Sequence, residues 1–454
     1  MSIQSINPAN NTLLKTYNQL NEAEIENLLA RADNTFHSWR QTTFAERSRL
    51  MQECAAVLER DQQHYAELMT LEMGKPIKQA LGEINKCAAA CRYYAEHAEA
   101  FLKDELLDSE AQKSFVSYEP LGAVLAIMPW NFPYWQVFRF AAPALMAGNV
   151  GILKHASNVP QVALGIEEIF RKAGFPEGAF TTLLISTDQI EKLIQDDRVK
   201  AVTLTGSEGA GASVAQTAGR EIKKTVLELG GSDPFLVLED ADLDKAAETA
   251  VNSRMINTGQ SCIAAKRFMV VEPIAEAFLE KMKAILEAKK TGDPLAEDCD
   301  YGPLARRDLA AGLQKQVDQS VANGATIYLA GGHQNTDTAY FHPMILTDIK
   351  PGMPAYEEEL FGPVALVFVV KDAAEAVKIA NDHRYGLGAT IFTQNVAEGE
   401  KIARQIESGN VFINAMMQSS PAVPFGGIKK SGYGRELSYV GIREFVNQKT
   451  IWIG

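Results

Sequence analysis

The chain has 454 residues, of which 46% are hydrophobic and 22% charged, and its formal net charge is −13. This composition is typical of a globular protein and excludes general disorder, collagen and low-complexity repeats. The acidic balance disfavours broad binding to nucleic acid or to an anionic membrane, so we expect neither as a partner.

The cysteine content indicates a reducing compartment, and the apolar segments do not favour secretion or a membrane span. The five cysteines are Cys54, Cys87, Cys91, Cys262 and Cys299. An odd number in a chain of this length does not favour a disulfide framework. The polar start MSIQSINPANN lacks the order of a secretory signal, and the apolar stretch 140–153 is broken by Pro143 and Asn149. We therefore expect a cytoplasmic protein.

The first hundred residues are predicted to be helical. Apolar residues recur at helical spacing over 25–32, where Asn21 and Glu24 are placed as a capping box. The same spacing predicts a second helix that continues from Leu50 to Tyr65. A third helix is predicted from Ile77, after Pro76, to about residue 102.

Short apolar runs then alternate with helices. We predict strands over 122–129, 150–154, 180–185, 199–206 and 223–230, with helices over 133–147, 160–173, 189–195 and 208–218. A second series has strands over 234–238, 266–271, 365–370, 388–392 and 410–414, with helices over 242–255, 274–288, 304–322 and 396–407. This alternation predicts an α/β fold with two mostly parallel sheets covered by helices.

Two apolar segments remain outside both series. Residues 114–120 and 445–454 are rich in β-formers, and we predict that they pair as strands. Exposed apolar strands commonly meet a partner subunit, so these segments favour a homo-oligomer.

Three polar residues in restricted surroundings are suited to acyl chemistry. Cys262, in NTGQSCIAAKR, is either a nucleophile or a buried structural cysteine. Glu228, in LELGG, is either a desolvated general base or a solvated strand-end charge. Asn131, in PWNFP, is either an oxyanion donor or part of a rigid loop.

A phosphate-binding turn is also present, and a metal site is not expected. In TGSEGAG (205–211) a predicted strand meets a predicted helix, and backbone amides there suit a pyrophosphate. The seven histidines are scattered without metal-ligand spacing. Cys87 and Cys91 lie four apart on a predicted helix, where core packing is favoured over metal binding.

Together these segments resemble the NAD(P)-dependent aldehyde dehydrogenase superfamily. PWNFP, TGS-x-x-x-G, LELGG, NTGQ-x-C, EE-x-FGP and PFGG-x-K-x-SG-x-GRE occur in the family's order over about residues 129–436, and Glu228 precedes Cys262 by 34 residues. The resemblance implies a Rossmann-like cofactor domain (1–105 and 121–229), an α/β catalytic domain (230–430), and a small β oligomerisation arm with the C-terminal tail (106–120 and 431–454). It further implies a homodimer or homotetramer.

The resemblance implies a role for each candidate residue. The Cys262 thiolate attacks the aldehyde, Asn131 and the Cys262 amide hold the oxyanion, hydride passes to the nicotinamide, and Glu228 activates water to hydrolyse the thioester. Trp130 and Lys154 would line the adenosine side, and Leu229 would touch the carboxamide. The implied cofactor contacts are Trp130, Lys154, Ser157, Gly206, Ser207, Gly211, Leu229, Glu359 and Phe361.

One departure from the family pattern bears on the cofactor. NAD-preferring relatives often have a Glu where this chain has Ser157. A carboxylate there would repel a 2′-phosphate by roughly 4 kcal/mol at 4 Å and an effective dielectric of 20. We predict that NADP is preferred and that NAD is also used.

The resemblance also indicates the substrate. Succinate-semialdehyde dehydrogenases place an arginine at the position of Arg139 to hold the far carboxylate, a contact worth roughly 1.5–3 kcal/mol. The other implied substrate contacts are Trp135, Ser261, Ser419 and Ser420. Ile256 and Ala264 replace a second arginine and a second cysteine of some members, so we expect a single-arginine grip and no disulfide switch at Cys262.

Other interpretations remain open at this point. Arg139 is alternatively a surface cation on an amphipathic helix. The substrate is alternatively another short aldehyde, such as glutarate semialdehyde, lactaldehyde or an aromatic aldehyde. A cysteine hydrolase without a nucleotide, or a structural relative without activity, would retain the same fold.

Overall fold

The computed structural model describes residues 2–454 and begins with a hairpin that the sequence analysis missed. Strands β1 (Ser2–Ile6) and β2 (Leu13–Asn18) pair antiparallel before helix α1 (Glu22–Trp39). The expectation of helices alone is wrong here, because alternate residues of β1 are buried. The start of α1 is as predicted, with both bonds of the Asn21–Glu24 capping box formed.

The helical region contains four helices rather than three. Residues Leu50 and Tyr65 were predicted to share one helix, but the chain bends at Asp61 between α2 (Phe44–Arg60) and α3 (Gln62–Met73). Helix α4 (Ile77–Phe101) has the predicted extent, and the side chains of Cys54, Cys87 and Cys91 are buried in this core.

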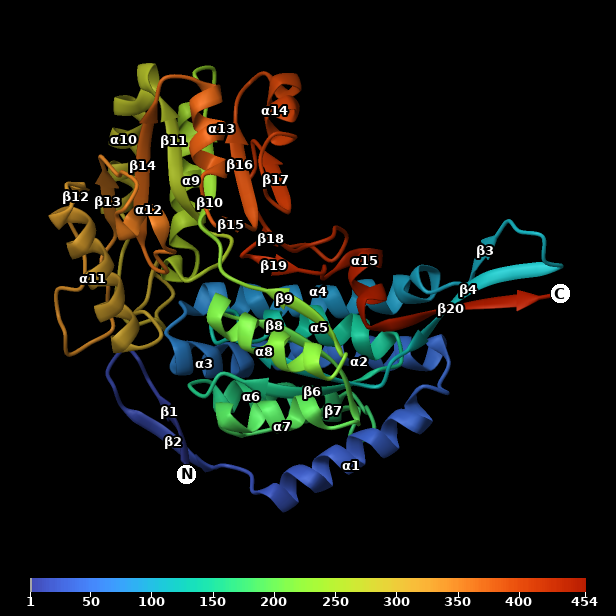
Figure 1. Cartoon of the computed structure of the whole chain (residues 1–454). Helices are drawn as coiled ribbons and strands as arrows, with labels where there is room; N and C mark the ends of the chain where they lie inside the picture. Colours follow the sequence, from blue (N-terminus) through green and yellow to red (C-terminus); the bar gives the residue numbers. More distant parts are fainter. Residues whose placement is uncertain (1) are drawn as a thin grey trace.

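The first sheet has six strands and confirms the first predicted series (Figure 1). Its order is β19-β9-β8-β5-β6-β7, and only the edge strand β19, the last of the six in the sequence, runs antiparallel. Its strands are β5 (Ala123–Met128), β6 (Val150–His155), β7 (Phe180–Thr182), β8 (Val199–Thr205), β9 (Lys224–Glu228) and β19 (Gly432–Tyr433). The helices are α5 (Trp135–Met146), α6 (Pro160–Lys172), α7 (Ile190–Gln195) and α8 (Glu208–Arg220).

The second sheet has seven strands in the order β12-β13-β14-β11-β10-β16-β17, of which β12 is antiparallel. They are β10 (Asp233–Val237), β11 (Ala265–Val271), β12 (Thr326–Leu329), β13 (Met344–Thr347), β14 (Val364–Val370), β16 (Gly388–Phe392) and β17 (Asn410–Ile413). The helices are α9 (Leu243–Met255), α10 (Glu272–Glu287), α11 (Arg307–Ala322), α12 (Pro354–Glu357), α13 (Ala373–Asn381) and α14 (Val396–Ala403). Strands β12 and β13 and helix α12, of four residues each, were not predicted because they are short. Helix α13, of nine residues, was also not predicted.

Helices cover both faces of this second sheet. Along β11, Phe268 and Val270 belong to the core on one face, while Met269 and Val271 belong to the core on the other. A parallel sheet buried on both sides reads as a continuous apolar run, as KRFMVV does.

The predicted terminal strand pair is confirmed. Strand β4 (Lys113–Pro120) pairs antiparallel with β20 (Val446–Ile453), β3 (Glu105–Leu107) adds a third strand, and the arm projects from both sheets (Figure 1). The side chains of Leu106 and Trp452 are 72% and 53% exposed on it. A two-stranded ribbon, β15 (Tyr385–Gly386) with β18 (Ile428–Lys429), and helix α15 (Ser438–Ile442) complete the fold.

The motif residues follow the carboxyl ends of parallel strands. PWNFP follows β5, Ser157 follows β6, Gly206 follows β8, and Glu228 is the last residue of β9. Ligands of open α/β sheets bind at this edge. Between residues 2 and 454, none of the helices is both long and apolar enough to cross a membrane.

Candidate active site

A strained loop delivers Cys262 to the start of β11. After α9, Asn257, Thr258 and Gly259 have φ angles of 52°, 55° and 76°, in the left-handed region. A Cβ on Gly259 would lie 2.4 Å from the Gly362 backbone, so only glycine fits this close approach. Such strain persists where the surrounding structure holds it, and it often marks a functional loop.

Asn131 is fastened to the same loop. Its side-chain Nδ2 donates to the Gln260 carbonyl at 3.2 Å, and Asn257 Nδ2 donates to the Asn131 carbonyl at 2.7 Å. Because a primary amide has two N–H groups, one Asn131 N–H remains for another acceptor. Asn131 and Cys262 line the same cavity.

Cys262 lies where two cavities meet. One, of about 440 Å³, is lined by Trp135, Arg139, Ser261 and Ser419. The other, of about 280 Å³, is lined by Asn131 and by residues of the predicted nucleotide site: Trp130, Gly206, Ser207, Leu229, Glu359 and Phe361. The nucleophile candidate is therefore reachable from both sides.

The surroundings of Cys262 favour the thiol over the thiolate. Burial raises its pKa to about 12, while the charges of Arg139 and Lys266 act in the opposite direction. A base or a bound cofactor must therefore favour the thiolate before it can attack.

Glu228 is buried behind the cavity walls rather than in them. Both carboxylate oxygens lack a hydrogen-bond partner among residues 2–454, and a Cβ on Gly426 would lie 2.7 Å from Oε1. Burial raises the pKa of Glu228 well above its ordinary value, with Arg139 lowering it and Glu436 raising it. The interpretation as a solvated strand-end charge is wrong, because the residue is only 2% exposed.

Arg139 is a buried residue, so the surface-cation alternative is wrong. It is 2% exposed on α5, forms an ion pair with Glu436, and donates from Nη2 to Thr205 Oγ1 at 3.1 Å. Its guanidinium carbon lies 4.9 Å from the centre of the Phe425 ring. Arg139 lines the larger cavity, but a carboxylate of this chain already pairs with its charge.

The two predicted loop serines have different surroundings. Ser419 lines the larger cavity, and Trp135 Nε1 donates to its Oγ at 2.9 Å. Ser420 is not among the lining residues, and its Oγ accepts from the Ala422 amide at 3.4 Å within its own turn. Ser261 lines the cavity beside Cys262, and its hydroxyl has no hydrogen-bond partner in the described part of the chain.

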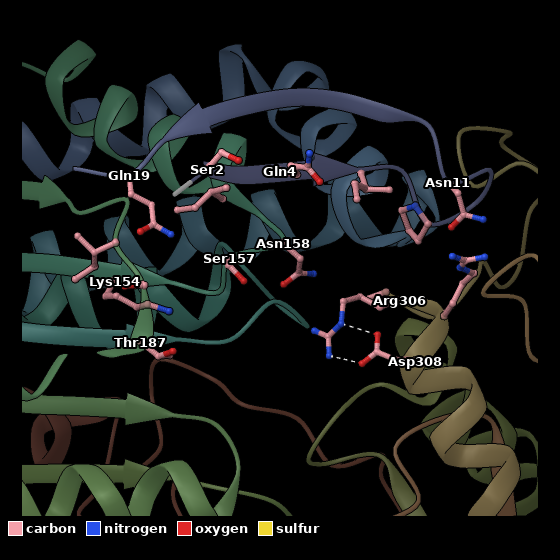
Figure 2. Close-up of a pocket in the computed structure, with 17 residues that line it drawn as sticks. Ser2, Gln4, Asn11, Gln19, Lys154, Ser157, Asn158, Thr187, Arg306 and Asp308 are labelled. Atoms are coloured by element: carbon pink, nitrogen blue, oxygen red, sulfur yellow. Dashed lines mark hydrogen bonds and ion pairs between the residues drawn. The ribbon is translucent and has the colours of Figure 1, made fainter. Parts of the chain in front are cut away.

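A third cavity, of about 720 Å³, contains Lys154 and Ser157 (Figure 2). Figure 2 shows these side chains facing it, with the β1–β2 hairpin along one side and the Arg306–Asp308 ion pair across from them. Lys154 is 6% exposed, and no carboxylate among residues 2–454 pairs with it. A buried cation without a partner fits an anionic group such as a phosphate.

The remaining predicted cofactor contacts divide into lining and packing residues. Trp130 lies edge-on to Phe361, with ring centres 5.9 Å apart, in the smaller cavity rather than beside Lys154. Ser207 caps α8 by accepting from the Ala210 amide. Gly211 lies outside the lining, and a Cβ there would approach the Leu229 side chain to 2.7 Å. Gly211 thus lets α8 pack closely against Leu229.

A sequence profile of the aldehyde dehydrogenase family matches residues 1–451. The chain belongs to the aldehyde dehydrogenase family. It is 54% identical over 453 residues to a Synechocystis sp. protein named probable succinate-semialdehyde dehydrogenase (NADP+), with full coverage of both chains. It is 50% identical over 458 residues to a succinate-semialdehyde dehydrogenase (NADP+) of Mycolicibacterium paratuberculosis, covering 100% and 97% of the two chains.

Solved structures agree with this membership. A succinic semialdehyde dehydrogenase from Streptococcus pyogenes, in complex with NADP+, superimposes with a TM-score of 0.97 at 39% identity, covering 99% of each chain. A succinate-semialdehyde dehydrogenase from Burkholderia pseudomallei gives a TM-score of 0.96 at 31% identity, covering 99% of this chain and 94% of the other. The predicted fold class is confirmed.

In this aldehyde dehydrogenase, Lys266 is a site residue that the sequence analysis missed. Its Nζ donates to the carbonyl oxygens of Ser261, Cys262 and Ala264 at 2.8, 2.9 and 3.2 Å, and lies 3.2 Å from Glu359 Oε1. Lys266 therefore ties the Cys262 loop to a predicted cofactor contact. Its place four residues after Cys262 in a buried strand was the available signal.

Glu83 was also missed. Its Oε1 accepts from the backbone amides of Tyr134 and Trp135, both at 2.9 Å, and its carboxylate pairs with buried Lys75. The start of α5 in this dehydrogenase is thereby fixed, and with it the loop that bears Asn131. Glu83 lies on a helix whose apolar spacing gave no sign of a buried charge.

Proposed function

We propose that this protein oxidises succinate semialdehyde to succinate, with NADP as the preferred cofactor and NAD as a second one. The names of the full-length relatives support the reaction and the cofactor. The observation that carries the proposal is the cavity of about 440 Å³, in which Cys262 shares the walls with three basic residues, Lys86, Arg139 and Lys289. An aldehyde with a distant carboxylate requires that combination. Two carboxylates, Glu83 and Asp300, also line the cavity.

The proposed first step is nucleophilic addition. Cys262 Sγ gives its proton to solvent water and attacks the aldehyde carbon, and the carbonyl oxygen becomes an oxyanion. The free N–H of Asn131 and the Cys262 backbone N–H donate to that oxyanion. Support comes from the hydrogen bond that Asn131 donates to the Gln260 carbonyl, since a donor held in place loses little freedom in the transition state.

The second proposed step releases the acid. When bound, NADP would supply the acceptor for the hydride of the carbon attached to Cys262. Loss of that hydride would leave a thioester on Cys262. Glu228 then takes a proton from water, the hydroxide attacks the thioester carbon, and Cys262 departs as a thiolate. Burial, which raises the pKa of Glu228, favours this role because a base with a raised pKa binds the proton of water more strongly. Its carboxylate has to turn from Gly426 towards the cavity to act.

The residues present fit NADP. Lys154 and Ser157 would hold the 2′-phosphate, because Lys154 is a buried cation without a carboxylate partner among the described residues. Gly206 and Ser207, at the amino end of α8, would receive the pyrophosphate. The nicotinamide half would contact Trp130, Leu229, Glu359 and Phe361 in the cavity that reaches Cys262.

The substrate would lie in the larger cavity. Trp135, Arg139, Ser261 and Ser419 are the proposed contacts, and all four line it. We also propose a homodimer or homotetramer joined through the β3–β4–β20 arm, supported by its exposed apolar residues. A cytoplasmic location remains part of the proposal.

Steady-state kinetics test the proposal. Purified protein is assayed with succinate semialdehyde, glutarate semialdehyde, lactaldehyde, pentanal and benzaldehyde, each with NADP and with NAD. We expect the highest kcat/KM for succinate semialdehyde with NADP, and no turnover by Cys262→Ser. A higher kcat/KM for a neutral aldehyde, or thioester hydrolysis without any nucleotide uptake, would remove the proposal.

A further inference from the structure

The substrate cavity contains a cation that no carboxylate of the described chain neutralises. Lys86, half-buried on α4, lines the cavity together with Cys262. Its Nζ donates to Ser419 Oγ at 2.8 Å and lies 4.2 Å from the centre of the Trp135 ring. None of the ion pairs formed within residues 2–454 includes Lys86, whereas Arg139 is paired with Glu436.

Ser419 is arranged to donate a hydrogen bond. Its Oγ accepts from both Lys86 Nζ and Trp135 Nε1, at 2.8 and 2.9 Å. A hydroxyl oxygen has two acceptor lone pairs and one proton, so these bonds leave only the proton available. The Lys86 ammonium has two further N–H groups. Two kinds of donor therefore lie side by side in the cavity wall.

We propose that Lys86 and the Ser419 hydroxyl together bind the far carboxylate of the aldehyde, and that Lys86 determines specificity for carboxylated substrates. This inference rests on the proposed function and adds Lys86 to Arg139 as a residue that binds the carboxylate. A carboxylate on Arg139 has to share a guanidinium with Glu436, whereas a carboxylate on Lys86 gains a charge-assisted bond without breaking an ion pair.

The surroundings of Lys86 determine when it is charged. Glu83 and Cys87 face it from its own helix, Arg139 faces it from α5, and Lys75 from the preceding loop. Burial, aided by Arg139, lowers the pKa of Lys86 to about 8. The ammonium is therefore present below pH 8 and is lost as the pH rises through that value, which weakens carboxylate binding.

The test compares a carboxylated aldehyde with a neutral one. The variants are Lys86→Met, which removes the charge, and Lys86→Arg, which keeps it. The matched control is Lys78→Met, an exposed lysine on the same helix. We expect Lys86→Met to raise KM for succinate semialdehyde at least about tenfold, with kcat and the pentanal kinetics within about twofold of wild type. Lys86→Arg restores most of the preference, and Lys78→Met changes nothing.

The pH dependence of the wild type gives a second readout that needs no variant. The ratio of kcat/KM for succinate semialdehyde to that for pentanal is measured from pH 6.5 to 9.5. Titration of Cys262 and Glu228 affects both substrates, so it cancels in the ratio. We expect the ratio to fall at least threefold above about pH 8, and to stay flat in Lys86→Met.

The outcomes separate this inference from the proposed function. If wild type has no preference for succinate semialdehyde over pentanal, the proposed function fails. If wild type has that preference but Lys86→Met keeps it, or loses activity on both aldehydes alike, the role of Lys86 is refuted while the function stands. If the wild-type ratio of kcat/KM for succinate semialdehyde to that for pentanal is constant across the pH range, the role of Lys86 is refuted as well.

Discussion

Replacing Lys266 by Met should disable the Cys262 loop and weaken cofactor binding together. The buried ammonium of Lys266 donates to three carbonyl groups at and around Cys262 and faces Glu359. Met has a similar length but no hydrogen-bond donor. The variant leaves the Glu359 carboxylate without its cation and releases the carbonyl oxygens of Ser261, Cys262 and Ala264.

The size of the effect follows from the burial of the pair. At 3.2 Å and an effective dielectric of 20, the attraction between Lys266 and Glu359 is about 5 kcal/mol before desolvation. Lys266 is fully buried and the Glu359 side chain is 15% exposed, so solvent screens the pair little. Removing one partner of a buried pair costs roughly 3–5 kcal/mol of folding free energy. Burial raises the pKa of Glu359, so part of this cost is relieved when Glu359 takes up a proton.

The assay combines thermal unfolding, NADP titration and steady-state kinetics. We expect Lys266→Met to unfold several degrees below wild type, to bind NADP at least about tenfold more weakly, and to lose at least about 100-fold in kcat. The control is Lys281→Met, which breaks the exposed pair with Asp244 and should cost at most about 1 kcal/mol. If Lys266→Met keeps wild-type kcat and NADP affinity, the loop does not depend on this lysine.

Three further substitutions test the other parts of the proposal. Ser157→Glu should lower the NADP:NAD ratio of kcat/KM at least about tenfold, because a carboxylate beside the 2′-phosphate is repelled by roughly 4 kcal/mol at 4 Å; an unchanged ratio contradicts the cofactor assignment. Glu228→Gln should give one rapid turnover of NADPH and then slow release of acid, and full steady-state kcat would show that Glu228 is dispensable. Trp452→Asp should shift the oligomer towards monomer in size-exclusion chromatography, since Trp452 is 53% exposed on the arm; an unaltered elution volume argues against the arm as the interface.

The parts of the site that lie next to one another in sequence could be predicted. PWNFP, TGSEGAG and LELGG each follow or end a strand whose apolar run is continuous, so their placement at one sheet edge follows from parallel pairing. The break at Asp61 could not be predicted in this way, because the apolar spacing continues from α2 into α3. The strands β12 and β13 could not be predicted either, because four residues are too few to show a periodicity.

The electrostatic partners of the site could not be predicted, since they come from distant parts of the chain. Arg139 was expected to offer a free charge, yet Glu436, almost 300 residues later, returns to it through the C-terminal segment that pairs with β9. Lys86 reaches the same cavity from a helix that precedes every recognised motif. Because a buried pair has little net charge, an anion there is attracted less by Arg139 than by Lys86, which has no ion-pair partner among residues 2–454. A motif therefore locates the reacting atoms. The charge that selects the substrate depends on which ionisable side chains form ion pairs in the folded chain, and the spacing of residues in the sequence does not predict those pairs.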